Sequence, residues 1–138
     1  MIIGHERPIF DIMNKQKLQD TNFEFNFDER GFYYLRLKDG EEFNLKDISQ
    51  IHAFILSNFD SMRKPFLVEF GFGSTISDGV QEHLTTSANR FSTADAILIS
   101  TFAHQLIAQF YIRHYKPTKP TKVFNDIFEA LEWIEKQD

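Results

Sequence analysis

The spacing of apolar residues changes along the chain, and this change constrains the fold more than any other feature. In FEFNFD (residues 23–28) phenylalanine occupies every second position, and polar residues occupy the positions between. That alternation predicts a strand with one buried face. FYYLRL (32–37) predicts a second strand, with turn signals at RG (30–31) and KDG (38–40). We therefore expect a β-hairpin in the first third of the chain.

From Asn44 onward, helical spacing alternates with short apolar runs. Asn44 can cap a helix, and Asp47 follows three residues later. There its carboxylate interacts favourably with the positive end of the helix dipole. Apolar runs predict strands at 66–70, 96–100 and 121–124, and helical patterns begin near residues 44, 77, 101 and 125. This alternation implies βαβ units with right-handed crossovers. The sequence thus predicts a single α/β domain of order β-β-α-β-α-β-α-β-α, with a mixed, mainly parallel five-stranded sheet flanked by helices.

The helical patterns also predict which side chains are buried. The stripe of the first helix comprises Leu45, Ile48, Ile51, Ile55 and Phe59. For the helix near residue 101, the predicted buried face holds Phe102, Leu106 and Phe110, with either Ala103 or Ile107. The chain has 16 phenylalanines, which favour an aromatic-rich core. A ring-lined pocket for a lipophilic ligand is the alternative interpretation.

Length and charge narrow the class of protein. A chain of 138 residues is most simply one domain, with residues 1–20 as an N-terminal arm or short helix before a domain at 21–138. The absence of cysteine, of a signal peptide and of a long apolar stretch predicts a cytoplasmic protein without a membrane span. The net charge of −5 argues against nucleic-acid binding. The N-terminal arm and the hairpin edge leave a homodimer as an open alternative.

Three motifs in the C-terminal half carry a resemblance to known proteins. ADAILIS (94–100), KPTKPTKVF (116–124) and EALEWI (129–134) resemble a group of uncharacterised bacterial proteins that is common among Bacteroidetes. That group has the STAS-like, or SpoIIAA-like, fold of anti-sigma-factor antagonists, which is related to the CRAL-TRIO lipid-transfer domains. The resemblance covers about residues 23–136. It implies a regulatory or ligand-sensing module and no established reaction.

The loop GFGSTISDGVQEHL (71–84) invites three interpretations. It lacks the lysine of a Walker A loop, and Ile76 stands where a dinucleotide fingerprint needs its third glycine. The resemblance implies a regulatory serine at the start of the following helix, as in anti-sigma-factor antagonists. Ser74 and Ser77, with Asp78, are the candidate phosphoacceptor loop, since a phosphate is favourable at a helix start. The same residues also form an ordinary turn and helix cap.

A basic run follows the helix near residue 101. Arg113, Lys116, Lys119 and Lys122 fall within ten residues of an otherwise acidic chain. They are candidates for an anion site or a patch for a protein partner. The alternative is a set of cations that complement the helix C-terminus, followed by an extended proline-rich segment.

The sequence contains no motif for catalysis. The five histidines form no metal-binding pair, and no nucleophile elbow is present, so we expect no metal, no cofactor and no enzyme activity. The leading hypothesis is a non-enzymatic STAS-like regulatory or protein-interaction module with an unidentified protein partner. The alternative is a small lipophilic-ligand binding protein.

Overall fold

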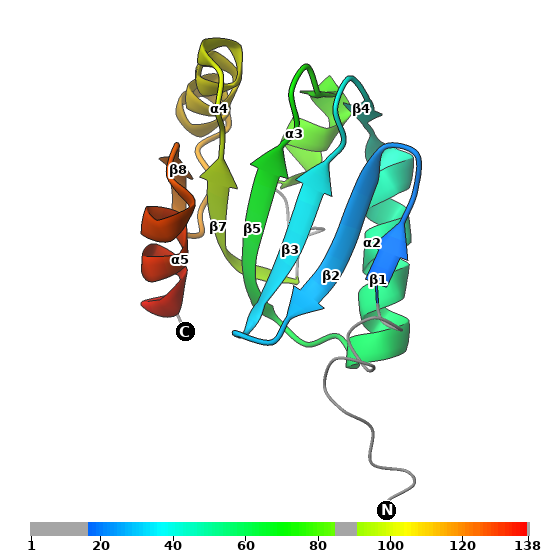
Figure 1. The fold of residues 1–138 in the computed structure, drawn as a ribbon. Coiled ribbons are helices and arrows are strands. Elements are labelled where there is room, and N and C mark those ends of the chain that lie inside the picture. Colours follow the sequence, from blue (N-terminus) through cyan, green and yellow to red (C-terminus); the bar gives the residue numbers. More distant parts are fainter. Residues whose placement is uncertain (1–16, 85–90, 138) are drawn as a thin grey trace, which may run out of the picture.

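A six-stranded sheet forms the centre of the molecule in this computed structural model, which describes residues 17–84 and 91–137 (Figure 1). The strands lie in the order β1-β2-β3-β5-β7-β8. Their bounds are β1 (Lys17–Gln19), β2 (Phe23–Asp28), β3 (Phe32–Leu37), β5 (Lys64–Phe70), β7 (Ser92–Leu98) and β8 (Thr121–Phe124). Strand β2 is antiparallel to both neighbours, and the pairs from β3 to β8 are parallel. The predicted mixed, mainly parallel α/β sheet is confirmed.

The sheet has six strands where the sequence predicts five, because β1 pairs with the outer edge of the hairpin. Lys17 lies opposite Asn26, and Gln19 lies opposite Glu24. This strand falls in the segment predicted as an arm or short helix, of which residues 1–16 lie outside the described residues. Three residues are too few to show a period in the sequence. Since β1 occupies the edge of β2, that hairpin edge is already paired within the chain.

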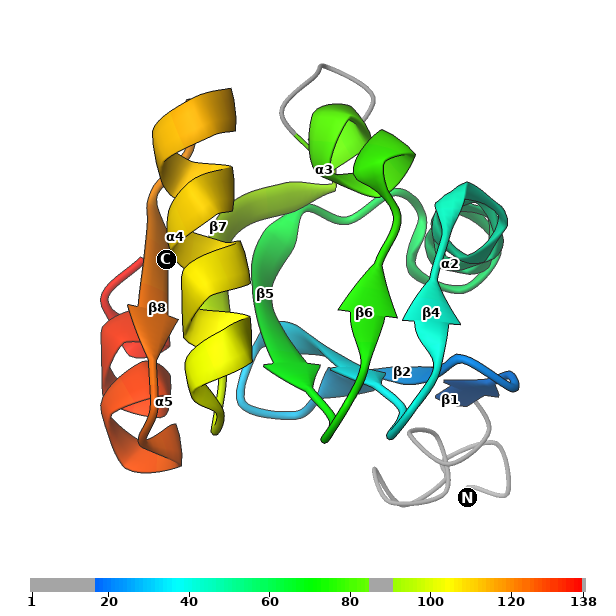
Figure 2. The same ribbon diagram turned by 90° about the horizontal axis from the view of Figure 1, so that it is seen from above.

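A second, two-stranded parallel sheet lies above the main one, formed by β4 (Glu42–Phe43) and β6 (Thr75–Ile76) (Figure 2). It joins the loop after β3 to the loop after β5. Gly71 makes this junction possible, because its N–H donates to the Leu37 carbonyl at 2.8 Å and an added Cβ would lie only 2.4 Å from the same oxygen. Gly71 therefore serves a close approach between two loops.

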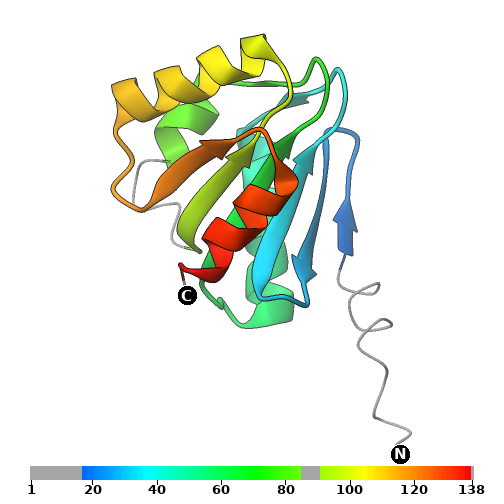
Figure 3. The same ribbon diagram turned by 60° about the vertical axis from the view of Figure 1, so that its left-hand side comes forward.

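Of the helices in the described residues, three cover one face of the sheet and one covers the other (Figures 1 and 3). Helices α2 (Leu45–Phe59), α3 (Asp78–Leu84) and α4 (Phe102–Tyr115) pack on the face that carries Phe23, Phe25 and Phe66. Helix α5 (Ile127–Glu135) packs on the opposite face through Ala130 and Ile134. The phenylalanines of β2 and β5 thus form the main core, as the alternation predicts.

The predicted buried face of α4 is wrong. Phe102 is 74% exposed, and Leu106 and Phe110 are 52% and 53% exposed. The buried residues are instead His104, Ala108 and Tyr111. Apolar residues lie on both sides of this helix, so its spacing does not decide which side packs against the sheet.

Candidate functional site

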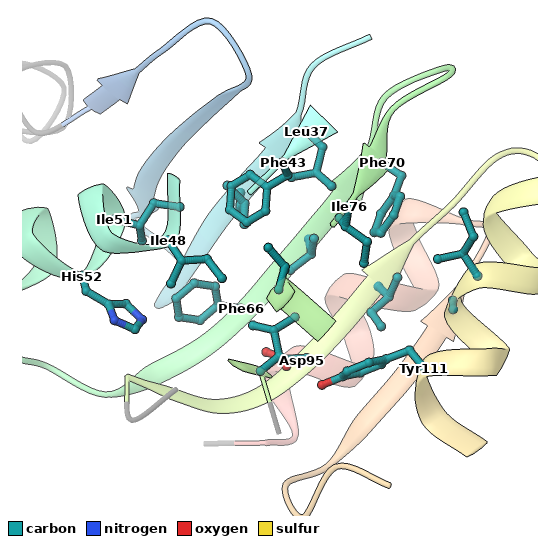
Figure 4. A pocket seen from close by; sticks show the side chains of 17 residues that line it. Leu37, Phe43, Ile48, Ile51, His52, Phe66, Phe70, Ile76, Asp95 and Tyr111 are labelled. Atoms are coloured by element: carbon teal, nitrogen blue, oxygen red, sulfur yellow. The ribbon is translucent and has the colours of Figure 1, made fainter. Parts of the chain in front are cut away.

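An interior cavity of about 80 Å³ lies between the main sheet and the three helices on its larger face (Figure 4). Seventeen residues line it, and all but three of them are apolar. The lining consists of Leu35, Leu37, Phe43, Ile48, Ile51, His52, Phe66, Val68, Phe70, Ile76, Val80, Leu84, Asp95, Ile97, Ile107, Ala108 and Tyr111. The cavity is therefore a mainly apolar site with a few polar groups.

Adjacent parallel strands build the floor of the cavity. Side chains at alternate positions of β3, β5 and β7 point to the same face, so Leu35, Val68 and Ile97 are in register across the sheet. Ile48 and Ile51 of α2 form one wall, and α3, α4 and the small β4–β6 sheet complete the enclosure. On the α4 side the lining includes Ala108, whose short side chain leaves room that a larger residue would fill.

Asp95 is the charged group in the lining, and its carboxylate has partners on both oxygens. The Ser92 hydroxyl donates to Oδ1 at 2.6 Å, and Lys119 Nζ lies 3.0 Å from Oδ2. Both side chains of this ion pair are largely buried, at 13% exposure for Lys119 and 9% for Asp95. The ammonium is close enough for ion pairing but makes no well-aligned hydrogen bond within the described residues. The pair brings no net charge to the cavity.

The Tyr111 hydroxyl lies at the same end of the cavity as Asp95 (Figure 4). Tyr111 is 4% exposed, and its hydroxyl has no hydrogen-bond partner among residues 17–84 and 91–137. Burial raises the pKa of this hydroxyl, and the negative charge of Asp95 raises it further. The group is therefore a neutral hydrogen-bond donor at physiological pH.

His52 supplies the third polar side chain of the lining. Its ring packs edge-on against Phe91, with centroids 5.0 Å apart, and lies 5.6 Å from the ring of His83. Burial lowers the pKa of His83. In the described part of the chain, no group of three histidine, aspartate or glutamate side chains could hold a metal ion.

The profile of a family described as a domain of unknown function, DUF7793, matches residues 26–138. The chain belongs to this family. Its structure is similar to the crystal structure of an uncharacterised protein of the DUF3478 family with a SpoIIAA-like fold from Shewanella loihica PV-4. The TM-score is 0.52 at 15% sequence identity, over 81% of this chain and 91% of that chain. No curated protein matches the sequence.

The structural similarity confirms the predicted SpoIIAA-like fold for the DUF7793 domain. At this level of identity it shows the fold alone. Among the residues that the structure describes, no helix is long and apolar enough to span a membrane.

The candidate serines of the DUF7793 domain lie in different environments. Ser74 is 1% exposed, its hydroxyl donates to the Gly71 carbonyl at 2.7 Å, and its own carbonyl lies 2.7 Å from His104 Nε2. In this fold its hydroxyl is shielded from solvent and hydrogen-bonded within the loop. Ser77 is half-buried just before α3, and Asp78 is exposed as the first residue of that seven-residue helix. Phosphorylation of Ser77 stays a prediction.

The structure does not gather the four basic residues into one surface. Lys119 pairs with Asp95 in the interior, and Lys122 Nζ lies 5.4 Å from the centroid of the Phe124 ring. Arg113 and Lys116 are exposed at the end of α4, where Lys116 adopts the left-handed conformation of a C-cap and donates its N–H to Ile112. Their position suits complementing the helix dipole.

Asp95 and Tyr111 were absent from the predicted site. Asp95 stands before an apolar run, where an acidic residue is unusual, and this anomaly is the one sequence signal for a functional position. Tyr111 gives no such signal, because only the packing of α4 decides that it faces the cavity.

Proposed function

We propose that this DUF7793 domain is a non-enzymatic, cytoplasmic STAS-like regulatory domain that binds a small lipophilic ligand in its interior cavity. The cavity itself carries the proposal, because small-molecule sites are concave, mostly apolar and furnished with a few polar groups. The lining has this composition, with three polar residues among 17. Binding of the ligand would stabilise the folded state by mass action.

The size of the cavity restricts the ligand. A volume of about 80 Å³ has room for roughly five to eight water molecules, at about 10–15 Å³ of accessible space for each. That space suits a single ring or a short branched chain. A complete acyl chain would require the surrounding side chains to move. Because apolar cavities tend to stay dry and to bind apolar molecules, a small hydrocarbon is an appropriate first probe.

The polar groups of the cavity support binding more than catalysis. The Asp95 carboxylate already accepts from Ser92 and pairs with Lys119, which leaves it poorly placed to act as a base. The Tyr111 hydroxyl has a raised pKa and is not activated as a nucleophile.

Filling the cavity tests the proposal. Ala108→Leu on α4 adds three carbon atoms to the lining, whereas Ala103→Leu makes the same change on the exposed side of the same helix. We expect toluene to raise the melting temperature of the wild-type protein and of Ala103→Leu, but not of Ala108→Leu. Failure of toluene to stabilise the wild-type protein, or equal stabilisation of both variants, would contradict the proposal.

The exposed face of α4 favours a second function, in which regulation involves self-association. Phe102, Leu106 and Phe110 recur every four residues and remain exposed. Between Phe102 and Ile112 the sequence has no aspartate, glutamate, lysine or arginine. Two copies of a chain with net charge −5 repel each other in general. A contact through this uncharged stripe brings no like charges together, so the repulsion is smallest there. We therefore propose a second copy as the partner.

Side chains spaced by four residues form the ridges that pack two helices at a crossing angle of about −50°. Leu106→Glu places a charge at the centre of that contact. Leu56→Glu, at a position 47% exposed on α2, is the matched control. In sedimentation-velocity experiments we expect dimers for the wild-type protein and for Leu56→Glu, and monomers for Leu106→Glu. A wild-type monomer at every concentration overturns self-association.

A further inference from the structure

One buried hydroxyl distinguishes the α4 end of the cavity. The two tyrosines of β3 use their hydroxyl groups: Tyr33 donates to the Met62 carbonyl at 2.8 Å, and Tyr34 donates to Glu69. Tyr111 is as deeply buried as a core residue, yet no partner for its hydroxyl exists in the described part of the chain. Buried polar groups in folded proteins are normally hydrogen-bonded, so this donor points to a missing acceptor.

The charges around this hydroxyl restrict that acceptor. Asp95 carries a negative charge that its ion pair with Lys119 balances. A ligand carboxylate would be repelled by Asp95 at short range, and a ligand cation would meet a carboxylate that already has two partners. A neutral oxygen has neither disadvantage. A hydroxyl can also accept from Tyr111 and donate to a remaining lone pair of Asp95.

We propose that the cavity selects a small neutral alcohol or phenol, whose apolar body lies among the side chains of β5, β7 and α2 and whose hydroxyl accepts a hydrogen bond from Tyr111. This inference rests on the proposed ligand-binding function and specifies the class of ligand. It distinguishes the site from one for hydrocarbons, fatty acids or amines.

Phenol and toluene are a matched pair of probes, because a hydroxyl and a methyl group on one ring have similar size. The dissociation constant of each is measured by NMR titration for the wild-type protein, Tyr111→Phe and Tyr115→Phe. Tyr115 lies one turn further along α4 and does not line the cavity. We expect the preference for phenol over toluene to fall by about 2- to 10-fold in Tyr111→Phe, which is the effect of one hydrogen bond. The preference in Tyr115→Phe stays at its wild-type value.

The outcomes separate the two proposals. If neither probe binds the wild-type protein, the ligand-binding function fails and this inference fails with it. If both bind and Tyr111→Phe leaves their ratio unchanged, the cavity binds ligands but the role of Tyr111 is wrong. A measurement on the wild-type protein is independent of variant stability: with labelled tyrosine, phenol but not toluene shifts the Tyr111 ring carbon that bears the hydroxyl. Equal shifts with both probes overturn the inference, as does binding of benzoate more tightly than phenol.

Discussion

Helices α2 and α4 lie on opposite sides of the cavity, and they contact it in different ways. On α2 the large apolar side chains Ile48, Ile51 and Ile55 face the sheet and are at most 5% exposed. On α4 the buried residues are His104, Ala108 and Tyr111, whereas Phe102, Leu106 and Phe110 face solvent. Helix α2 therefore fills space in the core, whereas α4 leaves space and supplies a polar group to it.

The difference shows how a cavity arises in a chain with abundant phenylalanine. A cluster of rings from β2, β3, β5 and α2 packs together, as in the stacked pair of Phe25 and Tyr33 with centroids 5.4 Å apart. Toward α4 the packing is thinner, because Ala108 is short and Phe110 faces outward. Helix α2 thus stabilises the fold mainly by burial, whereas α4 combines a buried face beside the cavity with an exposed apolar face.

The largest expected loss of stability comes from substitutions in the buried face of α2. Ile55 is fully buried, so Ile55→Ala removes contacts and leaves a void that costs about 2–5 kcal/mol in the free energy of unfolding. The adjacent residue Leu56 is 47% exposed, and Leu56→Ala should change that free energy by no more than about 0.5 kcal/mol. Urea unfolding measures both. Similar losses for the two variants would mean that α2 does not pack as described.

The polar end of the cavity gives the next effect. Lys119→Met leaves the Asp95 carboxylate with Ser92 as its main partner. We expect the free energy of unfolding to fall by about 1–3 kcal/mol. This is less than for a fully buried pair, because both side chains keep some exposure to solvent. The double variant Asp95→Asn/Lys119→Met removes both charges and should recover part of that loss. Thermal and urea unfolding of the single and double variants test this. A double variant less stable than Lys119→Met contradicts the ion-pair explanation.

The N-terminal caps of helices α2 and α4 should differ less in their contribution to stability. In α2, Asn44 and Asp47 form a reciprocal capping box, and Asp47 also accepts from Asn22 Nδ2 at 3.1 Å. In α4, Thr101 accepts one hydrogen bond, from His104 N at 3.1 Å. We expect Asp47→Ala to cost about 1–2 kcal/mol and Thr101→Ala about 0.5–1 kcal/mol. Urea unfolding of both variants measures the two losses. A larger loss for Thr101→Ala than for Asp47→Ala would contradict the difference between the two caps.

The sequence predicts α2 well and α4 poorly for a physical reason. Asn44, Asp47 and the isoleucine stripe all indicate one helix with one buried face, and the structure confirms it except at Leu45, which is 46% exposed in the first turn. In α4 the helix itself is correctly predicted, but it carries apolar residues on all of its faces. Their spacing therefore cannot decide whether the side of Phe102 or the side of Ala108 faces the sheet. Strands β1, β4 and β6 are too short to show a period, and they depend on partners elsewhere in the chain.

The site depends even more on tertiary structure. Asp95 and Lys119 are far apart in sequence, and they meet because β7 and β8 pair with Asp95 opposite Thr121. The phenylalanine content leaves a lipophilic pocket as an alternative interpretation, but it does not say where such a pocket lies. The polar end of the cavity comes from residues that local patterns do not mark, and its position depends on the register of the sheet.

The smallest expected effect is a pH dependence that involves the α2 side of the cavity. Burial lowers the pKa of His83, whose ring lies against His52 of α2. The unfolded chain takes up a proton near the ordinary histidine value of 6.5, while the folded chain takes it up only at lower pH. The contribution of His83 is therefore complete above pH 6.5 and is lost as the pH falls through the folded-state pKa. Unfolding free energies measured down through this range should decline less steeply for His83→Gln than for His114→Gln, a change at an exposed residue of α4. Equal slopes would show that α3 leaves His83 in water and would contradict its burial beside His52.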